Sequence, residues 1–284
     1  MKLFRKLLGL GAVATAVVGV SACKNANDDG VTTIYAETKG APAPFIYQSD
    51  NGTLEGYDIA VINEVFNRLP QYKLDLTISD SALTDAQTGL IDFSINNWSY
   101  NSDRAKSYYF SYPYTRAKYG IYSAKGTSYD SFEALAEAGV KVFGSAGNNT
   151  TNAIENYNEK HPDKQVTIEY SSADITVKLP YYISGEYAEV GDLPVLNSWA
   201  QSYPDEFAQL ELTQLSDDYV TQNITTSATS HLLFNRVNGN ADSLRKEVSE
   251  KIKELHDDGT LKQLALQWVG IDITPNDSDY VYLN

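Results

Sequence analysis

The chain is poor in cysteine, histidine and cationic residues. Its 284 residues contain one Cys, three His, and 22 Lys and Arg against 37 Asp and Glu, which gives a formal net charge of −15. The single cysteine, Cys23, cannot form a disulfide within the chain. Neutralising the phosphates of a nucleic acid needs clustered Lys and Arg, so we expect no nucleic-acid partner.

Motifs for catalysis, metal binding and phosphate binding are also missing. The sequence has no G-x-S-x-G nucleophile turn and no Walker-type phosphate loop, so any ATPase must be another subunit. His161 and His256 follow polar helix ends, where a cation suits the helix dipole, and neither has an evident catalytic partner. The Asp-Asp pairs at 28–29, 217–218 and 257–258 are typical of turns. We therefore expect no catalytic residue, no metal and no cofactor.

The N-terminus is typical of a bacterial export signal. Three cations within the first six residues precede an apolar run, residues 7–20, that is short for a membrane span. Small residues then lead into Cys23, and the ending "VSAC" resembles a lipoprotein signal. We predict a signal peptide over residues 1–22, acylation of Cys23 (palmitate), a flexible tether over 23–31, and an extracytoplasmic, lipid-anchored location. The alternative is a plain signal peptide with an incidental buried Cys23.

The remaining chain alternates strands and helices with short connections. Residues 32–38 alternate as a strand does, and Asn51-Gly52 marks the tip of a hairpin-like connection. Apolar residues at helical spacing predict a helix from Asp58, its expected N-cap, to a stop at Pro70. This alternation indicates an α/β fold with mostly parallel sheets that helices cover on both faces.

Two polar loops follow predicted strands and carry hydrogen-bonding groups that a core does not need. The first, "FSINNWSYNSDR" (93–104), combines two amides, a Trp, a Ser and an Arg, and the second, "GSAGNNTT" (144–151), opens a helix. Open α/β sheets bind ligands at the carboxyl ends of their strands, and free N–H groups at a helix start attract anions. Two such loops in two lobes predict a ligand cleft between the lobes.

Three segments resemble a known family. They are "PFIYQSDNGTLEGYDIAVINEVF", "GLIDFSINNWSYNSDRAKSYYFSYPY" and "ELHDDGTLKQLALQWVGID", in that order along the chain. Together they resemble the polar amino-acid-binding proteins of bacterial ABC importers, extracellular solute-binding protein family 3, over about residues 32–275. Within that family, "NNWSYNSDRAKSYYFS" is most similar to the L-cystine-binding lipoproteins of Gram-positive bacteria.

The resemblance implies a two-lobed fold of the type II periplasmic-binding-protein kind. Lobe 1 would comprise residues 32–123 and 227–284, and lobe 2 residues 124–226. The implied function is to bind a free amino acid, L-cystine or a related sulfur amino acid, and to deliver it to an ABC permease with its ATPase subunits. We expect a monomer, with a generic polar amino acid as the alternative ligand.

The resemblance also implies roles for residues of the first loop. Arg104 would bind the α-carboxylate of the ligand, because a guanidinium pairs bidentately with a carboxylate. Asn96, Asn97 and Ser99 would hold the ligand's ammonium and carboxylate. The alternative for Arg104 is a solvated helix face with Asp103 as its partner, whereas Trp98 is expected in the core.

In the second lobe the implied residues are Asn148, Asn149 and Thr150, which would form the other half of the carboxylate site. Simple N-capping is the alternative, and both roles are compatible. Two positions depart from the family pattern. Pro42 occupies the place of an aromatic that stacks on the ligand side chain, and Asp192 is the nearest candidate for the acid that binds the α-ammonium, one residue short of the expected register.

Two other classes of function remain open from the sequence alone. Some proteins of this fold are amino-acid dehydratases, which need a general acid at the floor of the cleft. The sequence shows no convincing cleft His or Glu, so we expect no enzyme activity. A surface sensor or adhesin with a degenerate pocket is the third hypothesis, which the departures at Pro42 and Asp192 keep open.

Overall fold

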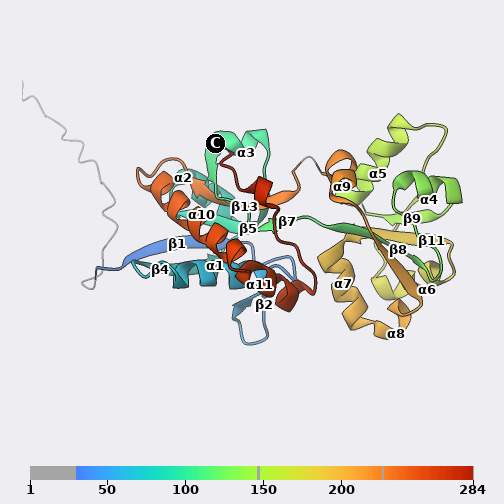
Figure 1. Cartoon of the computed structure of the whole chain (residues 1–284), viewed down its shortest axis with the longest axis horizontal. Helices are drawn as coiled ribbons and strands as arrows, with labels where there is room; N and C mark the ends of the chain where they lie inside the picture. The colour runs from blue at the N-terminus through green and yellow to red at the C-terminus, as the bar shows by residue number, and fades with distance from the viewer. Residues whose placement is uncertain (1–29, 146–147, 226, 284) are drawn as a thin grey trace, which may run out of the picture.

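The computed structural model describes residues 30–145, 148–225 and 227–283. Two lobes lie side by side along the long axis, each built on its own sheet (Figure 1). The predicted signal peptide and Cys23 lie outside the described residues. Within those residues no helix is both long enough and apolar enough to cross a membrane.

Lobe 1 contains a sheet in the strand order β4-β1-β5-β13-β6, with β7 also pairing with β13. Strands β4, β1 and β5 are parallel, whereas β13 runs antiparallel to β5, β6 and β7. The strands are β1 (Thr32–Thr38), β4 (Tyr72–Ile78), β5 (Phe93–Ser99), β6 (Tyr108–Phe110), β7 (Thr115–Arg116) and β13 (Thr229–Asn235). A small hairpin, β2 (Tyr47–Gln48) with β3 (Leu54–Glu55), forms the predicted connection around Asn51-Gly52.

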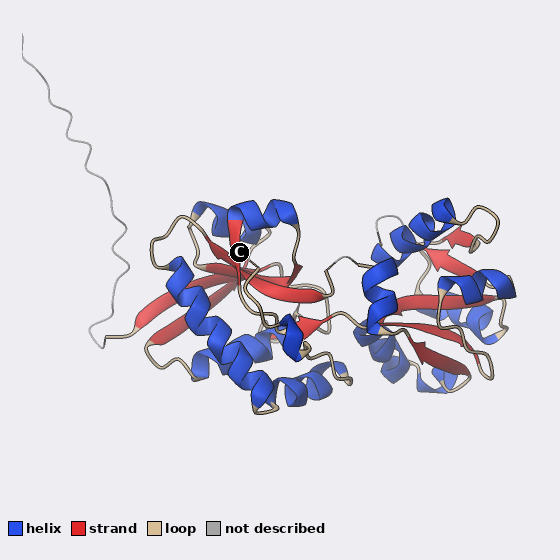
Figure 2. Cartoon of the chain, turned by 45° about the horizontal axis from the view of Figure 1, so that its top comes forward, coloured by secondary structure: helices blue, strands red, loops and turns tan. Residues whose placement is uncertain are grey.

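Helices cover both faces of this sheet, as Figure 2 shows. The larger core packs one face against α1, α10 and α11, and a smaller one packs the other face against α2. The helices are α1 (Tyr57–Asn67), α2 (Ala82–Thr88), α3 (Ser102–Ser107), α10 (Ala241–Asp257) and α11 (Thr260–Val269), with a 3-10 turn η1 (Asp277–Asp279). Trp98 is 8% exposed in the smaller core, which confirms its predicted packing role.

Lobe 2 contains a sheet in the order β10-β9-β11-β8-β12. Two apolar cores on opposite faces hold its helices. The strands are β8 (Tyr119–Ala124), β9 (Lys141–Gly144), β10 (Ile168–Tyr170), β11 (Tyr187–Asp192) and β12 (Leu210–Gln214). The helices are α4 (Phe132–Ala138), α5 (Asn149–Lys160), α6 (Ile175–Ile183), α7 (Leu193–Ser202), α8 (Pro204–Phe207) and α9 (Asp217–Asn223).

The predicted α/β class and the coverage of both sheet faces are confirmed, but both sheets are mixed. In lobe 2 the parallel strands β10, β9 and β11 are joined by β8, which is antiparallel to both β11 and β12. The chain enters lobe 2 through β8 and returns to lobe 1 through β13. Each of these two strands runs antiparallel to its neighbours in the sheet. Helical crossovers join only the strands within one lobe, so the entering strand is free to run the other way.

The chain crosses between the lobes twice. The first crossing lies between Arg116 and Tyr119, and the second lies between Asn223 and Thr229, which brackets the predicted boundary at 226/227. The predicted boundary at 123/124 is too late, because β8 already pairs within the second sheet. The pairing of β8 with β11 and β12 assigns this strand to lobe 2.

Helix α1 begins at a glycine and not at Asp58. Gly56 is the N-cap, at φ 120°, and a Cβ atom there would lie 2.3 Å from the carbonyl oxygen of Phe45 and 2.9 Å from that of Pro44. This close approach holds the segment that carries Phe45 against the start of α1. The N-cap prediction for Asp58 is wrong because the side chain is buried inside the first turn.

We expect Gly56→Ala to lower the free energy of unfolding by more than about 3 kcal/mol, because the new Cβ meets both an unfavourable φ and two backbone oxygens. Gly126→Ala is the matched control, since Gly126 has φ 84° but no atom within 4 Å of the position that a Cβ would occupy. Denaturant unfolding of both variants separates the cost of φ from the cost of the contact. Equal losses in the two variants would contradict the role given to the Phe45 segment.

Candidate functional site

Two adjoining cavities lie between the lobes. One of about 120 Å³, the crossing-side cavity, is lined by the segments that pass between the lobes and by residues from both sheets. The other, of about 280 Å³, is lined largely by β11 and α7, and we call it the α7-side cavity. Both cavities share five lining residues, two from lobe 1 and three from lobe 2: Phe45, Asn97, Tyr119, Asn149 and Asp192.

Asn97 lies near the end of β5 in a left-handed conformation, with φ 52°. Its backbone N–H donates to Asp58 Oδ2 (3.0 Å) and is also 3.1 Å from Tyr114 Oη. The Tyr114 hydroxyl in turn donates to the same Asp58 oxygen (2.8 Å). A non-glycine residue at positive φ costs about 1–3 kcal/mol, so these bonds hold Asn97 in a shape that it would not adopt alone.

Asp58 is fully buried, and burial raises the pKa of its carboxyl from 3.8 to about 7. Its Oδ1 has no hydrogen-bond partner, and neither does the buried Oδ1 of Asn97. The sequence pattern placed Asp58 at a helix start because Asp commonly caps helices. Its role in the structure is instead to position Asn97 at the wall of both cavities.

The predicted residues of lobe 2 lie where β9 leads into α5. Asn148 is the N-cap of α5, and its Oδ1 accepts from the backbone N–H of Thr150 (2.8 Å) and from its hydroxyl (2.6 Å). Asn149 is exposed and lines both cavities, and all three residues line the α7-side cavity. Asn148 therefore caps α5, while the side chain of the neighbouring Asn149 stays exposed at the cavities.

Asp192 ends β11 and precedes α7, and it lines both cavities. Its Oδ1 is buried without a hydrogen-bond partner. Burial raises the pKa of this carboxyl from 3.8 to about 7. Tyr119 lies beside it, and burial together with the Asp192 charge raises the pKa of the Tyr119 phenol to about 12. A buried carboxylate oxygen without a partner lowers its free energy strongly by accepting from a cation.

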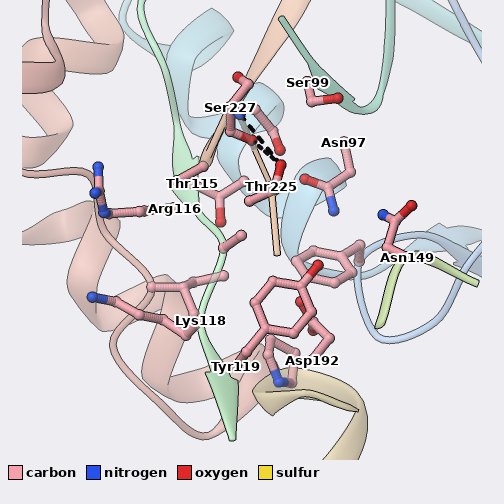
Figure 3. A pocket seen from close by; sticks show the side chains of 16 residues that line it. Asn97, Ser99, Thr115, Arg116, Lys118, Tyr119, Asn149, Asp192, Thr225 and Ser227 are labelled. Atoms are coloured by element: carbon pink, nitrogen blue, oxygen red, sulfur yellow. Dashed lines mark hydrogen bonds between the residues drawn. The ribbon is translucent and has the colours of Figure 1, made fainter. Parts of the chain in front are cut away.

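Two cationic residues line the crossing-side cavity but are already paired. Arg116 contacts Asp217 (3.2 Å) and Asp279 (2.7 Å), and Lys118 contacts Asp217 (2.6 Å). Figure 3 shows both cationic side chains pointing away from Asn97, Asn149 and Asp192, which surround the opposite part of the cavity. Arg116 and Lys118 therefore tie the first crossing segment to Asp217 at the start of α9 and to Asp279 in η1, and neither of them pairs with Asp192.

Arg104 lies behind the cavity wall and does not line either cavity. Its Nη1 donates to the Ser99 carbonyl oxygen (2.7 Å) and lies 3.4 Å from the Ser99 hydroxyl, and Ser99 lines the crossing-side cavity. The guanidinium also lies over the Trp98 ring, 5.1 Å from its centroid. Among residues 30–145, 148–225 and 227–283 no carboxylate pairs with Arg104. Asp103, the alternative partner, pairs with Lys106.

Asn96 lies away from the cavities. Its Oδ1 accepts from the Thr38 hydroxyl (3.0 Å) and from the Lys39 backbone N–H (3.0 Å). Neither cavity is lined by Asn96. Asn96 and Asn97 are part of strand β5 and not of a loop after it, because β13 pairs with this strand as far as Ser99. Successive strand residues point to opposite faces, and Asn96 therefore faces the neighbouring connection while Asn97 faces the cavities.

Several lining residues were not found from the sequence. Phe45 lines both cavities and supplies an aromatic ring that Pro42, which lines the α7-side cavity, cannot supply. Trp199 and Glu189 line the same α7-side cavity. The expectation that the cleft has no convincing Glu is wrong, because Glu189 is such a residue. It lies inside an apolar strand pattern, and only the packing of α7 over β11 assigns it to a cavity wall.

The histidines contribute nothing to either cavity. His231 is buried among core residues, and burial lowers its pKa to about 4, so it stays neutral. His161 packs on Tyr157 at the end of α5. The ring of His256 and the carboxylates of Asp257 and Asp277 come within 4.8 Å of one another on the surface of lobe 1, the one such group among the described residues. Nothing else at this surface group points to a bound ion.

We expect the unliganded protein to lose stability as the pH rises from about 4.5 to 8. The pKa values of Asp58, Glu189 and Asp192 are each raised to about 7, so the unfolded chain releases these protons first and ionisation then disfavours the folded state. Asp58→Asn keeps an acceptor for Asn97 and removes one proton. The unfolding free energy of Asp58→Asn should therefore change less with pH than that of the wild type. The difference is at most about 4 kcal/mol, because the pKa of Asp58 rises from 3.8 to about 7 at 1.36 kcal/mol per pKa unit.

The measurement is urea unfolding of both proteins at several pH values. Asp103→Asn is the control, since the Asp103 side chain is 87% exposed. If the unfolding free energy of Asp58→Asn depended on pH as steeply as that of the wild type, the carboxyl of Asp58 would not titrate near neutral pH.

Comparison with known proteins places this chain among the solute-binding proteins of bacterial amino-acid transporters. The family model of the bacterial extracellular solute-binding proteins, family 3, matches residues 34–271. The "Probable amino-acid-binding protein YxeM" of Bacillus subtilis is 29% identical over 273 residues, with 92% of this chain and 94% of that protein covered. The L-cystine-binding protein TcyK of the same organism is 24% identical, with 94% of each chain covered.

Solved structures share the fold. The L-cystine solute receptor of Neisseria gonorrhoeae, in its unliganded open conformation, superimposes with a TM-score of 0.68 at 23% identity. The match covers 86% of this chain and 95% of the receptor. The two-lobed architecture of type II periplasmic binding proteins predicted from the sequence is therefore confirmed.

Proposed function

Because the chain belongs to the bacterial extracellular solute-binding proteins, family 3, we propose that it binds a free amino acid between its lobes for an ABC importer. The observation that carries this proposal is the unpartnered Oδ1 of Asp192, which is buried at the wall of two cavities. An α-ammonium group supplies the cation that this oxygen lacks. The two nearby cations cannot do so because Asp217 and Asp279 already hold them.

The α-carboxylate of the ligand would bind at the opposite side, between Ser99 and Asn149. Both residues line the crossing-side cavity, and Arg104 contacts Ser99 from behind. A guanidinium has five N–H donors, and Arg104 has no carboxylate partner among the described residues. We assign Arg104 to the ligand carboxylate, which requires its side chain to leave the Ser99 carbonyl and turn toward the cavity. The N-terminus of α5 adds a favourable dipole for the same charge.

We propose L-cystine or a related sulfur amino acid as the ligand. Several relatives are named for L-cystine binding, among them TcyK of Bacillus subtilis. The α7-side cavity supports a ligand longer than a small amino acid, since it extends from Asp192 along α7 to Trp199. A generic polar amino acid is the second candidate.

Delivery would follow closure of the lobes around the ligand. A ligand that contacts Asn97 in lobe 1 and Asp192 in lobe 2 binds the closed state better than the open one and so favours it. We propose that the closed, monomeric protein docks on an ABC permease whose ATPase is a separate subunit. Acylation of Cys23, after removal of residues 1–22, would anchor the protein to the extracytoplasmic face of the cell membrane through the tether 23–31.

We expect Asp192→Asn to weaken amino-acid binding by at least about 100-fold, since breaking a buried charge pair costs about 3–5 kcal/mol. Isothermal titration calorimetry with L-cystine measures the loss. Asp205→Asn on α8 is the control, because Asp205 is exposed and lines neither cavity. Unchanged affinity in Asp192→Asn would remove the ammonium role.

Arg104→Ala should also lose most of the affinity while the melting temperature stays near that of the wild type. Arg104→Lys should recover only part of it, because a lysine offers a point charge and not a planar fork. Micromolar binding that persists in Arg104→Ala would take this residue out of the site.

Titration with turnover assays separates the three classes of function. Saturable binding of an amino acid without product formation supports the receptor. Release of ammonia or a keto acid from the bound amino acid supports a dehydratase, for which Glu189 or Asp192 would supply the acid. Absence of heat with all twenty amino acids and cystine supports a sensor or adhesin with a degenerate pocket.

A further inference from the structure

Glu189 lies on β11, three residues before Asp192, and lines the α7-side cavity that begins at that carboxylate. Its Oε2 accepts from the hydroxyl of Tyr182 on α6. The rest of the nearby wall is largely apolar, formed by Val190, Val195, Leu196 and Trp199. An acidic group at the end of an apolar passage costs free energy unless something of opposite charge reaches it.

Glu189 forms no ion pair with any of the described residues, and the one cation that acts on it does so weakly. On α6, Tyr182 is a hydrogen-bond donor without charge, and Lys178 lowers the pKa of Glu189 only as the last of three contributions. The ammonium of Lys178 lies over the ring of Phe143 and forms no ion pair in the part of the chain that the structure describes. On β11 the other acid is Asp192, of the same sign. Burial is the largest contribution and raises the pKa of Glu189 to about 7.

Glu189 and Asp192 are three residues apart on β11, so their side chains leave the strand on opposite faces, Glu189 toward Tyr182 and Asp192 at the strand end beside Tyr119. The α7-side cavity borders both residues. Three residues of strand span about 10 Å. Across a disulfide the two Cα atoms of cystine lie about 5.5–6 Å apart, and a charge-assisted hydrogen bond of about 2.8 Å extends each end. The length of such a ligand is therefore of the same order as the separation of the two strand positions.

We propose that Glu189 is a second cation subsite, which binds an ammonium group at the far end of the ligand side chain and selects amino acids that carry one. The inference rests on the amino-acid site proposed at Asp192. It makes the ligand class a diamino compound with an apolar middle section, to which L-cystine belongs through its second ammonium. A ligand with only a distal carboxylate would meet Glu189 as a like charge.

Two mixed disulfides of L-cysteine test this without any mutation. The disulfide with cysteamine keeps the distal ammonium and lacks the distal carboxylate, and the disulfide with 3-mercaptopropionate does the reverse. We expect the wild type to bind the cysteamine compound at least about 10-fold more tightly than the mercaptopropionate compound, measured by calorimetry at pH 7.5. L-lysine against L-norleucine repeats the comparison without sulfur.

Glu189→Gln then assigns the preference to this residue. The amide keeps the size of the side chain and an acceptor for Tyr182, so we expect the 10-fold preference to fall below about threefold. Affinity for S-methyl-L-cysteine, which has one ammonium, should stay within about twofold. Glu186→Gln is the control, because Glu186 precedes the same strand, is half exposed and pairs with Lys141.

Each outcome decides between the two proposals. If the wild type binds amino acids but does not prefer a distal ammonium, or Glu189→Gln keeps the preference, the subsite is wrong and the amino-acid site stands. If neither the disulfides nor any amino acid binds the wild type, the site at Asp192 is wrong and the subsite falls with it. Loss of S-methyl-L-cysteine binding in Glu189→Gln would assign Glu189 to cavity structure and contradict a selective role.

Discussion

The space between the lobes is built around carboxylates that form no ion pair with any residue in the described part of the chain. Asp58 in lobe 1 and Glu189 and Asp192 in lobe 2 all lie at or directly behind the cavity walls, and burial raises the pKa of each to about 7. Two of them keep a buried oxygen without a hydrogen-bond partner. Such an arrangement destabilises the empty protein near neutral pH, and a ligand cation reverses that cost where it can reach the carboxylate.

The two cations that line the crossing-side cavity pair with Asp217 and Asp279 instead of with these carboxylates. Arg116 joins Asp217 of lobe 2 to Asp279 near the C-terminus, and Lys118 adds a second contact to Asp217. These side chains are largely buried, so the ion pairs are screened less by salt than surface pairs are. These ion pairs of the first crossing thereby keep positive charge away from Asp192.

The sequence predicted those parts of the fold and site that depend on local pattern. The helix start at Asn148 and the turn at Asn51-Gly52 each follow from the conformational preference of one or two residues. Local pattern failed where packing overrides it. Asp58 resembles an N-cap, but Gly56 takes that place because only glycine permits the backbone contact with Phe45.

The antiparallel course of β8 and the cavity positions of Tyr119 and Glu189 could not be predicted, because they depend on which strands pair across distant parts of the chain. Both residues lie in segments that alternate as ordinary strands do. A strand pattern indicates which residues share a face, but the other elements decide whether that face meets a core or a cavity.

The two halves of the site differ in how far they are prepared for a ligand. Lobe 1 holds Asn97 at φ 52° because its backbone N–H donates to Asp58 and Tyr114, so this wall is ordered before anything binds. Lobe 2 offers Asp192 with an unpartnered oxygen and Asn149 with an exposed side chain. Binding at the ordered wall of lobe 1 costs little conformational entropy of the protein. The free energy gained when the ligand pairs with Asp192 then mainly favours the approach of lobe 2. Selectivity for the closed state would therefore depend on lobe 2, where Glu189 borders the α7-side cavity that begins at Asp192.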